Sequence, residues 1–208
     1  MEFYEAVNNR RTIRDFKDEP MDQEALHRII MAGLKAPTND HMRNWHFVVL
    51  DDKSRMEELI KKIPKKMSEK RVEFIMNSWR LQDACQRTMY KDGIPKQYQM
   101  LVNASCILIP LFEHKGDLLQ PKNLSALNGF ASIWCCIENM FLAATAEGYA
   151  CTLRIPMGEE EDHVKSVLNF PDGYHMPCYI GIGRPAEDAM IHIQKEYSLE
   201  ERIHRNEW

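Results

Sequence analysis

Three arginines lie within five positions near the start of the chain, in the segment NNRRTIRDF at residues 8–16. An arginine side chain is always charged and presents a planar set of N–H donors, which suits it to bidentate capture of phosphate or carboxylate. In extended chain alternate side chains share a face, so Arg10, Thr12 and Arg14 are expected to point together and Arg11 elsewhere. Two guanidinium groups and a hydroxyl on one face would make a cradle for one phosphate ester.

The arginine segment also has an interpretation that needs no ligand. Asp15, Asp18 and Glu19 follow closely and could pair with the arginines at the surface. The spacing alone favours this surface cluster, so a second segment is needed to argue for a binding site.

The segment APTNDHMRNW at residues 36–45 is a second group of polar side chains. It follows a predicted helix and precedes a predicted strand, and loops at strand edges are where ligand sites collect. Taken alone, it is better explained as an ordinary connection between a helix and a strand.

Most familiar catalytic signatures are absent from the sequence. There is no G-x-G-x-x-G, P-loop, H-E-x-x-H or G-x-S-x-G, and the histidines do not pair at helical ligand spacing. The acidic run at residues 159–162 could bind a cation, but carboxylates also stabilise the start of a helix, which explains the run better. The sequence therefore indicates no metal site.

The composition is that of an ordinary globular protein. The 208 residues, 44% of them hydrophobic and 28% charged, suffice for one sizeable domain. The net charge of −4 disfavours nucleic-acid binding. No apolar run reaches the roughly 18 residues of a membrane helix, and the first residues lack the apolar core of a secretion signal. The six cysteines form no C-x-x-C pair, which predicts buried reduced thiols and a cytoplasmic location.

Predicted helices and strands alternate along the chain, judged by apolar spacing and by short runs rich in β-branched residues. Helices are expected near residues 2–9, 21–37, 54–67, 125–147 and 158–171. Strands are expected at residues 46–50, 104–112, 149–156 and 178–185. No repeat and no boundary appears, so the pattern predicts one mixed α/β layered domain over residues 1–208.

Two stretches have features of their own. Residues 125–147 are apolar on nearly every face, which predicts burial on all sides, either as a central core helix or at a subunit interface. Residues 60–100 combine charge with Met, Trp and Tyr and are expected to be helical. They are a candidate lid or insert, and a solvated helix pair explains them equally well.

Together, the two polar segments resemble a known family. RRTIRDF at residues 10–16, then a helix, then APTNDHMRNWHFVVL at residues 36–50 closely resemble the N-terminal signature of the nitroreductase family of FMN-dependent enzymes. That signature is R-R-S-x-R-x-F, a helix, and A-P-S-x-x-N-x-Q-P-W before a strand. Later segments are also similar, so the resemblance runs from about residue 3 to residue 208 and is weakest over residues 60–100.

The resemblance implies which residues bind FMN. The arginine segment matches the family's phosphate- and ribityl-binding element, and the loop after the first long helix matches its A-P-S segment, which approaches the flavin held mainly by the other subunit. The implied cofactor-binding residues are Arg10, Arg11, Thr12, Arg14, Pro37, Thr38, Asn39, His41, Leu153, Arg154, Gly183 and Arg184. The family's phosphate-binding position in the tail falls near Lys195.

Three residues depart from the family pattern. His41, Arg43 and Asn44 stand where the family has asparagine, glutamine and proline. A histidine can still donate or accept one hydrogen bond, but it cannot present both an amide NH₂ group and a carbonyl. A positive charge at Arg43 would raise the reduction potential of a nearby flavin, whereas a solvent-facing Arg43 would not.

The resemblance also implies the architecture and activity. It implies an α+β fold, a three-layer α-β-α sandwich around a mostly antiparallel sheet, in an intertwined homodimer whose C-terminal extension, residues 186–208, reaches the partner subunit. The implied activity passes electrons from NADH or NADPH through FMN to a nitroaromatic, quinone or similar small acceptor, with ping-pong kinetics. The flavin carries the chemistry, so no catalytic residue is implied. No nucleic acid and no membrane is expected as a partner.

Two alternatives stay open at this point. One is a specialised flavoenzyme of the same fold, dehalogenase-like or flavin-fragmenting. The other is a non-catalytic flavin-binding protein, which the departures in the sequence HMRNW keep possible.

Overall fold

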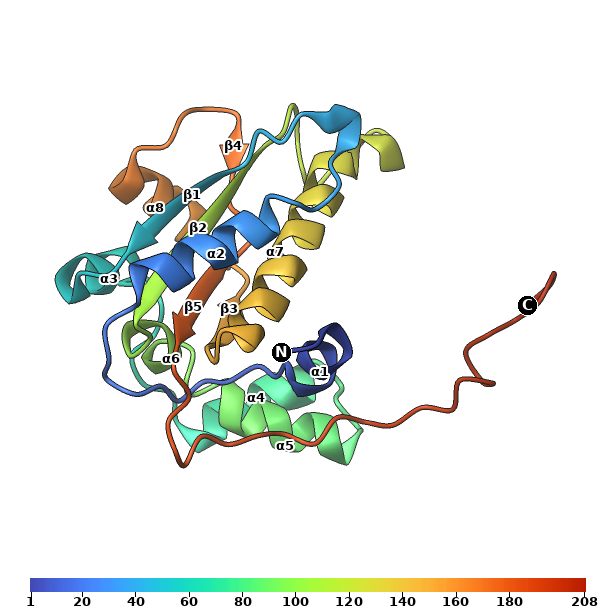
Figure 1. Cartoon of the computed structure of the whole chain (residues 1–208). Coiled ribbons are helices and arrows are strands. Elements are labelled where there is room, and N and C mark those ends of the chain that lie inside the picture. Colours follow the sequence, from blue (N-terminus) through green and yellow to red (C-terminus); the bar gives the residue numbers. More distant parts are fainter.

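An antiparallel sheet forms the centre of the computed structural model, which describes all 208 residues (Figure 1). Its strands are β1 (His46–Leu50), β2 (Cys106–Glu113), β3 (Ala150–Arg154), β4 (Tyr174–His175) and β5 (Tyr179–Gly183). The strand order is β1-β2-β5-β3, and the short β4 pairs with the end of β2. Every strand pair runs antiparallel, which confirms the predicted α+β sheet.

Helices cover both faces of this sheet. They are α1 (Phe3–Asn9), α2 (Gln23–Gly33), α3 (Lys53–Leu59), α4 (Glu69–Ser78), α5 (Ala84–Gly93), α6 (Gln99–Val102), α7 (Asn128–Ala146) and α8 (Glu160–Leu168). Strand β2 is apolar on both sides. Leu108 and Phe112 belong to the core with α2 and α7, whereas Ile107 and Ile109 belong to the core with α3, α6 and α8. Because successive strand residues face opposite sides, this alternation produces the three layers that were predicted.

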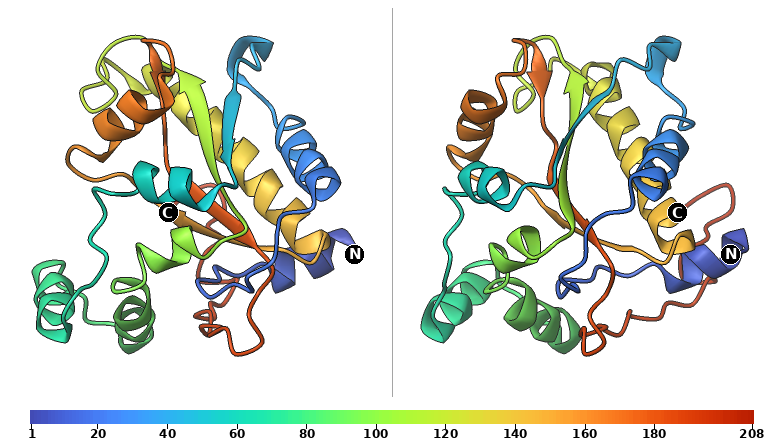
Figure 2. Two further views of the ribbon diagram at one scale, coloured as in Figure 1. Left: turned by 90° about the vertical axis from the view of Figure 1, so that its left-hand side faces the viewer. Right: turned by 60° about the vertical axis from the view of Figure 1, so that its left-hand side comes forward.

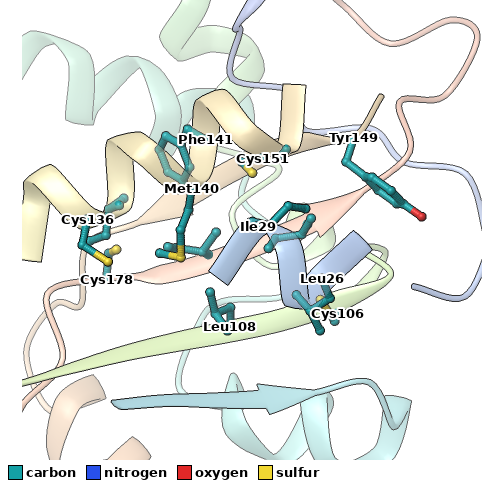
Figure 3. Packing of buried hydrophobic residues seen from close by; sticks show 14 of the residues in the cluster. Leu26, Ile29, Cys106, Leu108, Cys136, Met140, Phe141, Tyr149, Cys151 and Cys178 are labelled. Carbon is teal, nitrogen blue, oxygen red and sulfur yellow. The ribbon is translucent and has the colours of Figure 1, made fainter. Parts of the chain in front are cut away.

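The pair α2 and α7 packs closely against the sheet (Figure 3). Leu26 and Ile29 of α2 meet Met140 of α7 above Leu108 of β2 in one buried cluster. At Gly33 a Cβ atom would lie 2.6 Å from the Met140 side chain, so the close approach of the two helices requires glycine there. This pair fixes the first polar loop relative to the sheet.

The prediction that the long apolar helix is buried on every face is wrong for the single chain. Its buried residues form one stripe, which consists of Ile133, Cys136, Ile137, Met140, Phe141 and Ala144. Phe130, Trp134 and Leu142 are only half-buried. The segment Leu124–Ala146 is also long and apolar enough to cross a membrane by length and composition, contrary to the sequence expectation, although a core helix meets the same criterion.

Helices α4 and α5 lie apart from the two main cores, below the sheet in Figure 2. They have a small apolar cluster of their own, built on Val72, Met76 and Ile94. The helical character expected for residues 60–100 is therefore present. The C-terminal tail crosses α5 and then leaves the body of the protein (Figure 1). Its contacts to α5 and its N-cap include hydrogen bonds between His192 and Asp92 and from the Cys85 thiol to the Ile193 carbonyl oxygen, and an ion pair of Lys195 with Asp83.

Candidate functional site

The arginine segment runs in extended conformation beside β3. Thr12 forms a parallel bridge with Cys151, and the Ile13 N–H donates to the Cys151 carbonyl oxygen over 3.2 Å. Further along, Phe16 bridges Pro185. The predicted change from helix to extended chain after residue 9 is present, and it holds the arginines at the edge of the sheet.

The three arginines have different partners. Arg11 turns back and donates to the carbonyl oxygens of Asn8 and Arg10, over 2.7 and 2.8 Å, so it caps the end of α1. Arg10 has only a loose ion pair with Glu138 of α7, at 3.6 Å. Arg11 therefore contacts the backbone around the end of its own helix, whereas Arg10 contacts α7.

Arg14 is a buried guanidinium with few acceptors. Its side chain is 11% exposed, and its contacts are the Met89 sulfur at 3.5 Å and the Asp92 carboxylate at 3.7 Å. Burial lowers the pKa of Arg14, and the charges of Asp92 and Asp15 offset that effect only in part. A guanidinium has five N–H donors, and leaving buried donors unpaired is unfavourable. Arg14 therefore has free capacity for an anionic oxygen ligand, which fits the phosphate of a flavin mononucleotide.

The guanidinium of Arg14 packs against helix α5. A Cβ atom at Gly93 would lie 3.0 Å from the Arg14 Nε and 3.1 Å from its Cζ. Glycine at this position lets the side chain of Arg14 lie against the helix.

A cavity of about 840 Å³ opens beside Arg14. Its lining comes from Arg14 of the arginine segment, from residues 154–160 and from residues 64–97. The lining includes Arg14, Lys66, Met67, Arg71, Phe74, Ile75, Trp79, Tyr90, Gly93, Gln97, Arg154, Ile155, Met157 and Glu160. The Trp79 and Tyr90 rings meet edge to face, with their centroids 5.4 Å apart. The pocket thus joins cationic side chains to a wall that contains aromatic rings.

Arg154 is held at the back of this pocket by a buried ion pair. Its Nε and Nη2 donate to the Glu160 carboxylate over 3.0 and 2.5 Å, and its Nη1 donates to Gln97 over 2.9 Å. The pair ties the end of β3 to the first turn of α8. Sequence reasoning explained the acids at residues 159–162 by the helix start and missed this ion pair, because no local spacing links a strand end to the helix that follows.

The second polar segment lies at the other end of α7 from α1 (Figure 1). Its residues line a different hollow, of about 400 Å³, and share no lining residue with the larger cavity. One chain therefore does not bring the two predicted segments together. A shared site over both segments needs a second subunit, as the resemblance implied.

The loop of this second segment has strained backbone and one orphaned hydroxyl. Asp40, His41 and Arg43 all have positive φ, between 46° and 52°, a region that favours glycine. The Thr38 Oγ1 atom is buried without a hydrogen-bond partner. Pro37, His41 and Arg43 are exposed. An unpaired hydroxyl in a strained, exposed loop is what a polar ligand or partner would complete.

The loop is fixed to α7 through Asn39. Its backbone N–H donates to Ser132 over 3.2 Å, and its side-chain oxygen accepts from Asn128 over 3.3 Å. Asn44 donates to Glu113 of β2 over 2.7 Å.

The remaining predicted residues have structural contacts. Leu153 of β3 pairs with Ile180, and a Cβ atom at Gly183 would lie 2.9 Å from the Phe16 ring. The Arg184 guanidinium covers the Tyr149 ring at 4.5 Å. These residues support the arginine segment rather than line the large pocket. Lys195, the tail position expected near the phosphate, pairs with Asp83 at 3.0 Å.

The antiparallel α+β sandwich is the fold of the nitroreductase-like flavoproteins. The chain belongs to the nitroreductase family, whose sequence profile matches residues 7–184. It is 23% identical over 201 residues to the iodotyrosine deiodinase of Nematostella vectensis, covering 96% of this chain and 73% of that protein.

Two solved structures share the fold along its whole length. An iodotyrosine deiodinase bound to FMN and 3-iodo-L-tyrosine aligns over 100% of both chains, at 15% identity and a TM-score of 0.74. An FMN-dependent nitroreductase from Clostridium difficile R20291 aligns over 98% of both chains, at 20% identity and a TM-score of 0.63. Both neighbours are FMN proteins, and at these identities the comparison shows that this chain has their fold.

Proposed function

We propose that this protein is an FMN-dependent reductase that takes electrons from NADH or NADPH and passes them to a small aromatic or quinone acceptor. The observation that carries the proposal is the pocket of about 840 Å³, in which the under-paired Arg14 meets an aromatic wall. A phosphate-binding corner and a flat apolar wall are the two features that a flavin and a planar acceptor need.

The residues of this chain have distinct roles in the proposal. Arg10 and Arg14 neutralise the phosphate, since both have loose ion pairs and free donors. Thr12 stands between them in the same extended segment, and of these three residues only Arg14 lines the large pocket. The Arg154–Glu160 pair fixes the end of β3 and leaves no free charge at the back of the pocket. When bound, FMN supplies the electron transfer, while the protein binds it and orients the partners in turn.

We also propose a homodimer, in which the loop at residues 37–41 of one subunit completes the site of the other. The orphaned Thr38 hydroxyl and the positive φ values in that loop support this arrangement. The tail at residues 186–208 would then extend over the partner subunit.

A cytoplasmic location is proposed on the state of the cysteines. All six are free, and four of them are buried. Burial raises the pKa of Cys106 and of Cys136 to about 12, so these thiols stay protonated and unreactive. Free thiols are typical of a reducing compartment.

Reductive dehalogenation is the second candidate function. It is favoured by the TM-score of 0.74 to a deiodinase that holds FMN and a halogenated tyrosine. The aromatic rings of the pocket would suit a halogenated phenol as well as a nitroaromatic.

One anaerobic experiment tests both candidates. The purified protein is expected to be yellow and to lose its visible flavin absorbance on addition of NADH or NADPH. Nitroaromatics or quinones should then restore the oxidised spectrum. If the flavin bleaches only with dithionite, and the reduced protein then releases halide from a halogenated phenol, the result would support dehalogenation instead. A third outcome is a bound flavin that neither NADH nor NADPH reduces and that, once reduced by dithionite, passes electrons to no acceptor. The protein would then bind flavin without catalysis.

A further inference from the structure

We propose that the large pocket selects aromatic acceptors that carry a negative charge, such as an aromatic carboxylate. The inference rests on the proposed reductase function and names the substrate class of the same site. It follows from the charges at the mouth of the pocket and from the rings beside them.

The charge balance of the pocket is opposite to that of the protein. Four of the lining side chains are cationic and one is a carboxylate, whereas the whole chain has a net charge of −4. The carboxylate, Glu160, is already paired with Arg154. The positive charge of the lining therefore comes from Arg14, Lys66 and Arg71. Of these, Arg14 is assigned to the flavin phosphate.

Lys66 and Arg71 are the two cations that the flavin does not explain. Both are exposed residues that line the pocket from the α4 side, opposite the arginine segment. Neither forms an ion pair with a carboxylate of this chain, whereas Lys62, Arg87 and Lys96 each do. The Arg71 guanidinium instead lies 5.3 Å from the centroid of the Phe74 ring. These two charges are free to attract an anion.

The rings lie close in sequence to these charges: Arg71 and Phe74 are on α4, and Lys66 precedes that helix. Phe74 follows Arg71 by three positions, and Trp79 is the residue that directly follows α4. Trp79 in turn meets Tyr90 of α5. A small molecule that carries its ring and its negative charge together would use both features at once, because planar rings pack against aromatic side chains and the charge meets Lys66 and Arg71.

The phosphates of the nicotinamide donor are the competing explanation for the two cations. A donor site would tie Lys66 and Arg71 to the preference for NADPH over NADH, and not to the charge of the acceptor. The two explanations therefore predict different kinetic changes in the same variants.

The test uses the FMN-loaded protein with two matched acceptors, 4-nitrobenzoate and 4-nitrobenzyl alcohol, which share a ring and a nitro group and differ in charge. The wild type should prefer the benzoate in kcat/KM, and the preference should weaken as salt rises. Lys66→Gln and Arg71→Gln should each lower the benzoate-to-alcohol ratio by about two- to fivefold, the range for an exposed ion pair. Lys70→Gln removes the same charge from the same helix but does not line this pocket, and it should leave the ratio unchanged.

The proposal is overturned if the ratio stays the same in both pocket variants. It is also overturned if the variants change kcat/KM for NADPH relative to NADH while the acceptor ratio stays constant. If the wild type reduces neither acceptor, the proposed function fails. The charge preference is then measured on its own, by titrating each compound into the FMN-loaded protein and following the flavin spectrum. Equal affinities for the charged and the neutral compound would overturn it there as well.

Discussion

Arg14 differs from an ordinary buried arginine in what surrounds it. Most buried arginines are bidentate with a carboxylate, as Arg154 is with Glu160. Arg14 instead has a sulfur atom and a carboxylate oxygen at 3.7 Å, so its desolvation is poorly compensated within the chain. At the scale of single residues, this contrast separates a structural arginine from a ligand-binding one in the same pocket.

Replacing Arg14 with alanine is expected to weaken FMN binding by roughly 1.5–3 kcal/mol, the range for a hydrogen bond to a charged group. Asp92 keeps Lys96 and His192 as partners in this variant, so the fold should persist. FMN affinity is measured by fluorescence titration of the apoprotein. Arg11→Ala removes the same charge nearby, and since Arg11 bonds the backbone of α1, it should cost clearly less FMN affinity. Equal losses in the two variants would contradict the assignment.

The Arg154–Glu160 pair should behave differently from Arg14, because both of its members are nearly buried, at 9% and 6% side-chain exposure. Glu160→Ala leaves an uncompensated charge inside and is expected to lower the free energy of unfolding by about 3–5 kcal/mol. The double variant Arg154→Met, Glu160→Met should recover most of that loss. Urea denaturation followed by circular dichroism measures both, and a double variant as unstable as the single one would refute this account.

Helix α5 links the arginine segment to the C-terminal tail at the scale of elements. Asp92 of α5 lies 2.7 Å from Lys96, 3.0 Å from His192 of the tail and 3.7 Å from Arg14. Lys96 also pairs with Asp15 in the arginine segment, at 2.7 Å. One carboxylate therefore joins three separate parts of the chain around the phosphate-binding corner.

This network should make stability depend on pH in the acid range. Burial by itself raises the pKa of Asp92. Hydrogen bonds from Lys96 and His192 and the positive charges of Lys96 and Arg14 lower it by more, so the pKa lies below its usual value. A carboxyl with a depressed folded pKa contributes stability above its unfolded pKa of about 3.9, and that contribution is lost as pH falls through the folded value. Asp92→Asn should therefore be less stable than wild type at pH 7, and the difference should shrink below about pH 4.

The measurement for Asp92 is the free energy of unfolding in urea at several pH values for wild type and Asp92→Asn. Other carboxyl groups titrate in both proteins, so only the difference between them reports on Asp92. Asp83→Asn is the comparison at the other end of the same helix: it removes the charge that pairs with Lys195 and keeps a side-chain oxygen that can cap the helix. A difference between wild type and Asp92→Asn that is constant from neutral to acid pH would contradict the network.

The sequence predicted the elements better than it predicted the contacts between them. Apolar spacing and caps such as Asp22 are local signals, so α2, β1, β2 and β5 lie where they were expected. The two-residue strand β4 has no such signal, because it exists only through its pairing with β2. Arg14 contacts α5 through a residue 75 positions away, and Arg154 pairs with a residue 6 positions away on another element. A sequence pattern does not specify such tertiary contacts.

The whole molecule leaves an apolar surface without a covering element. On α7, Phe130 and Trp134 are half-buried neighbours, 6.1 Å between ring centroids, that pack against the edge of the core and stay partly exposed. The two halves of the proposed flavin site also lie at opposite ends of this helix (Figure 1). A second copy packed along α7 would cover the apolar face and bring the loop of one chain to the arginine segment of the other.

Trp134→Glu tests this arrangement, because it places a charge in the proposed interface without touching either polar segment. The wild type is expected to be a dimer by light scattering, and the variant should become monomeric and lose bound FMN together, since each flavin would need both chains. Leu119→Glu, in a loop where Leu119 is 89% exposed, should change neither property. A monomeric wild type with full FMN content would contradict the shared site. So would binding of the wild type to lipid vesicles that Trp134→Glu abolishes, because the apolar face of α7 would then contact a membrane instead of a second subunit.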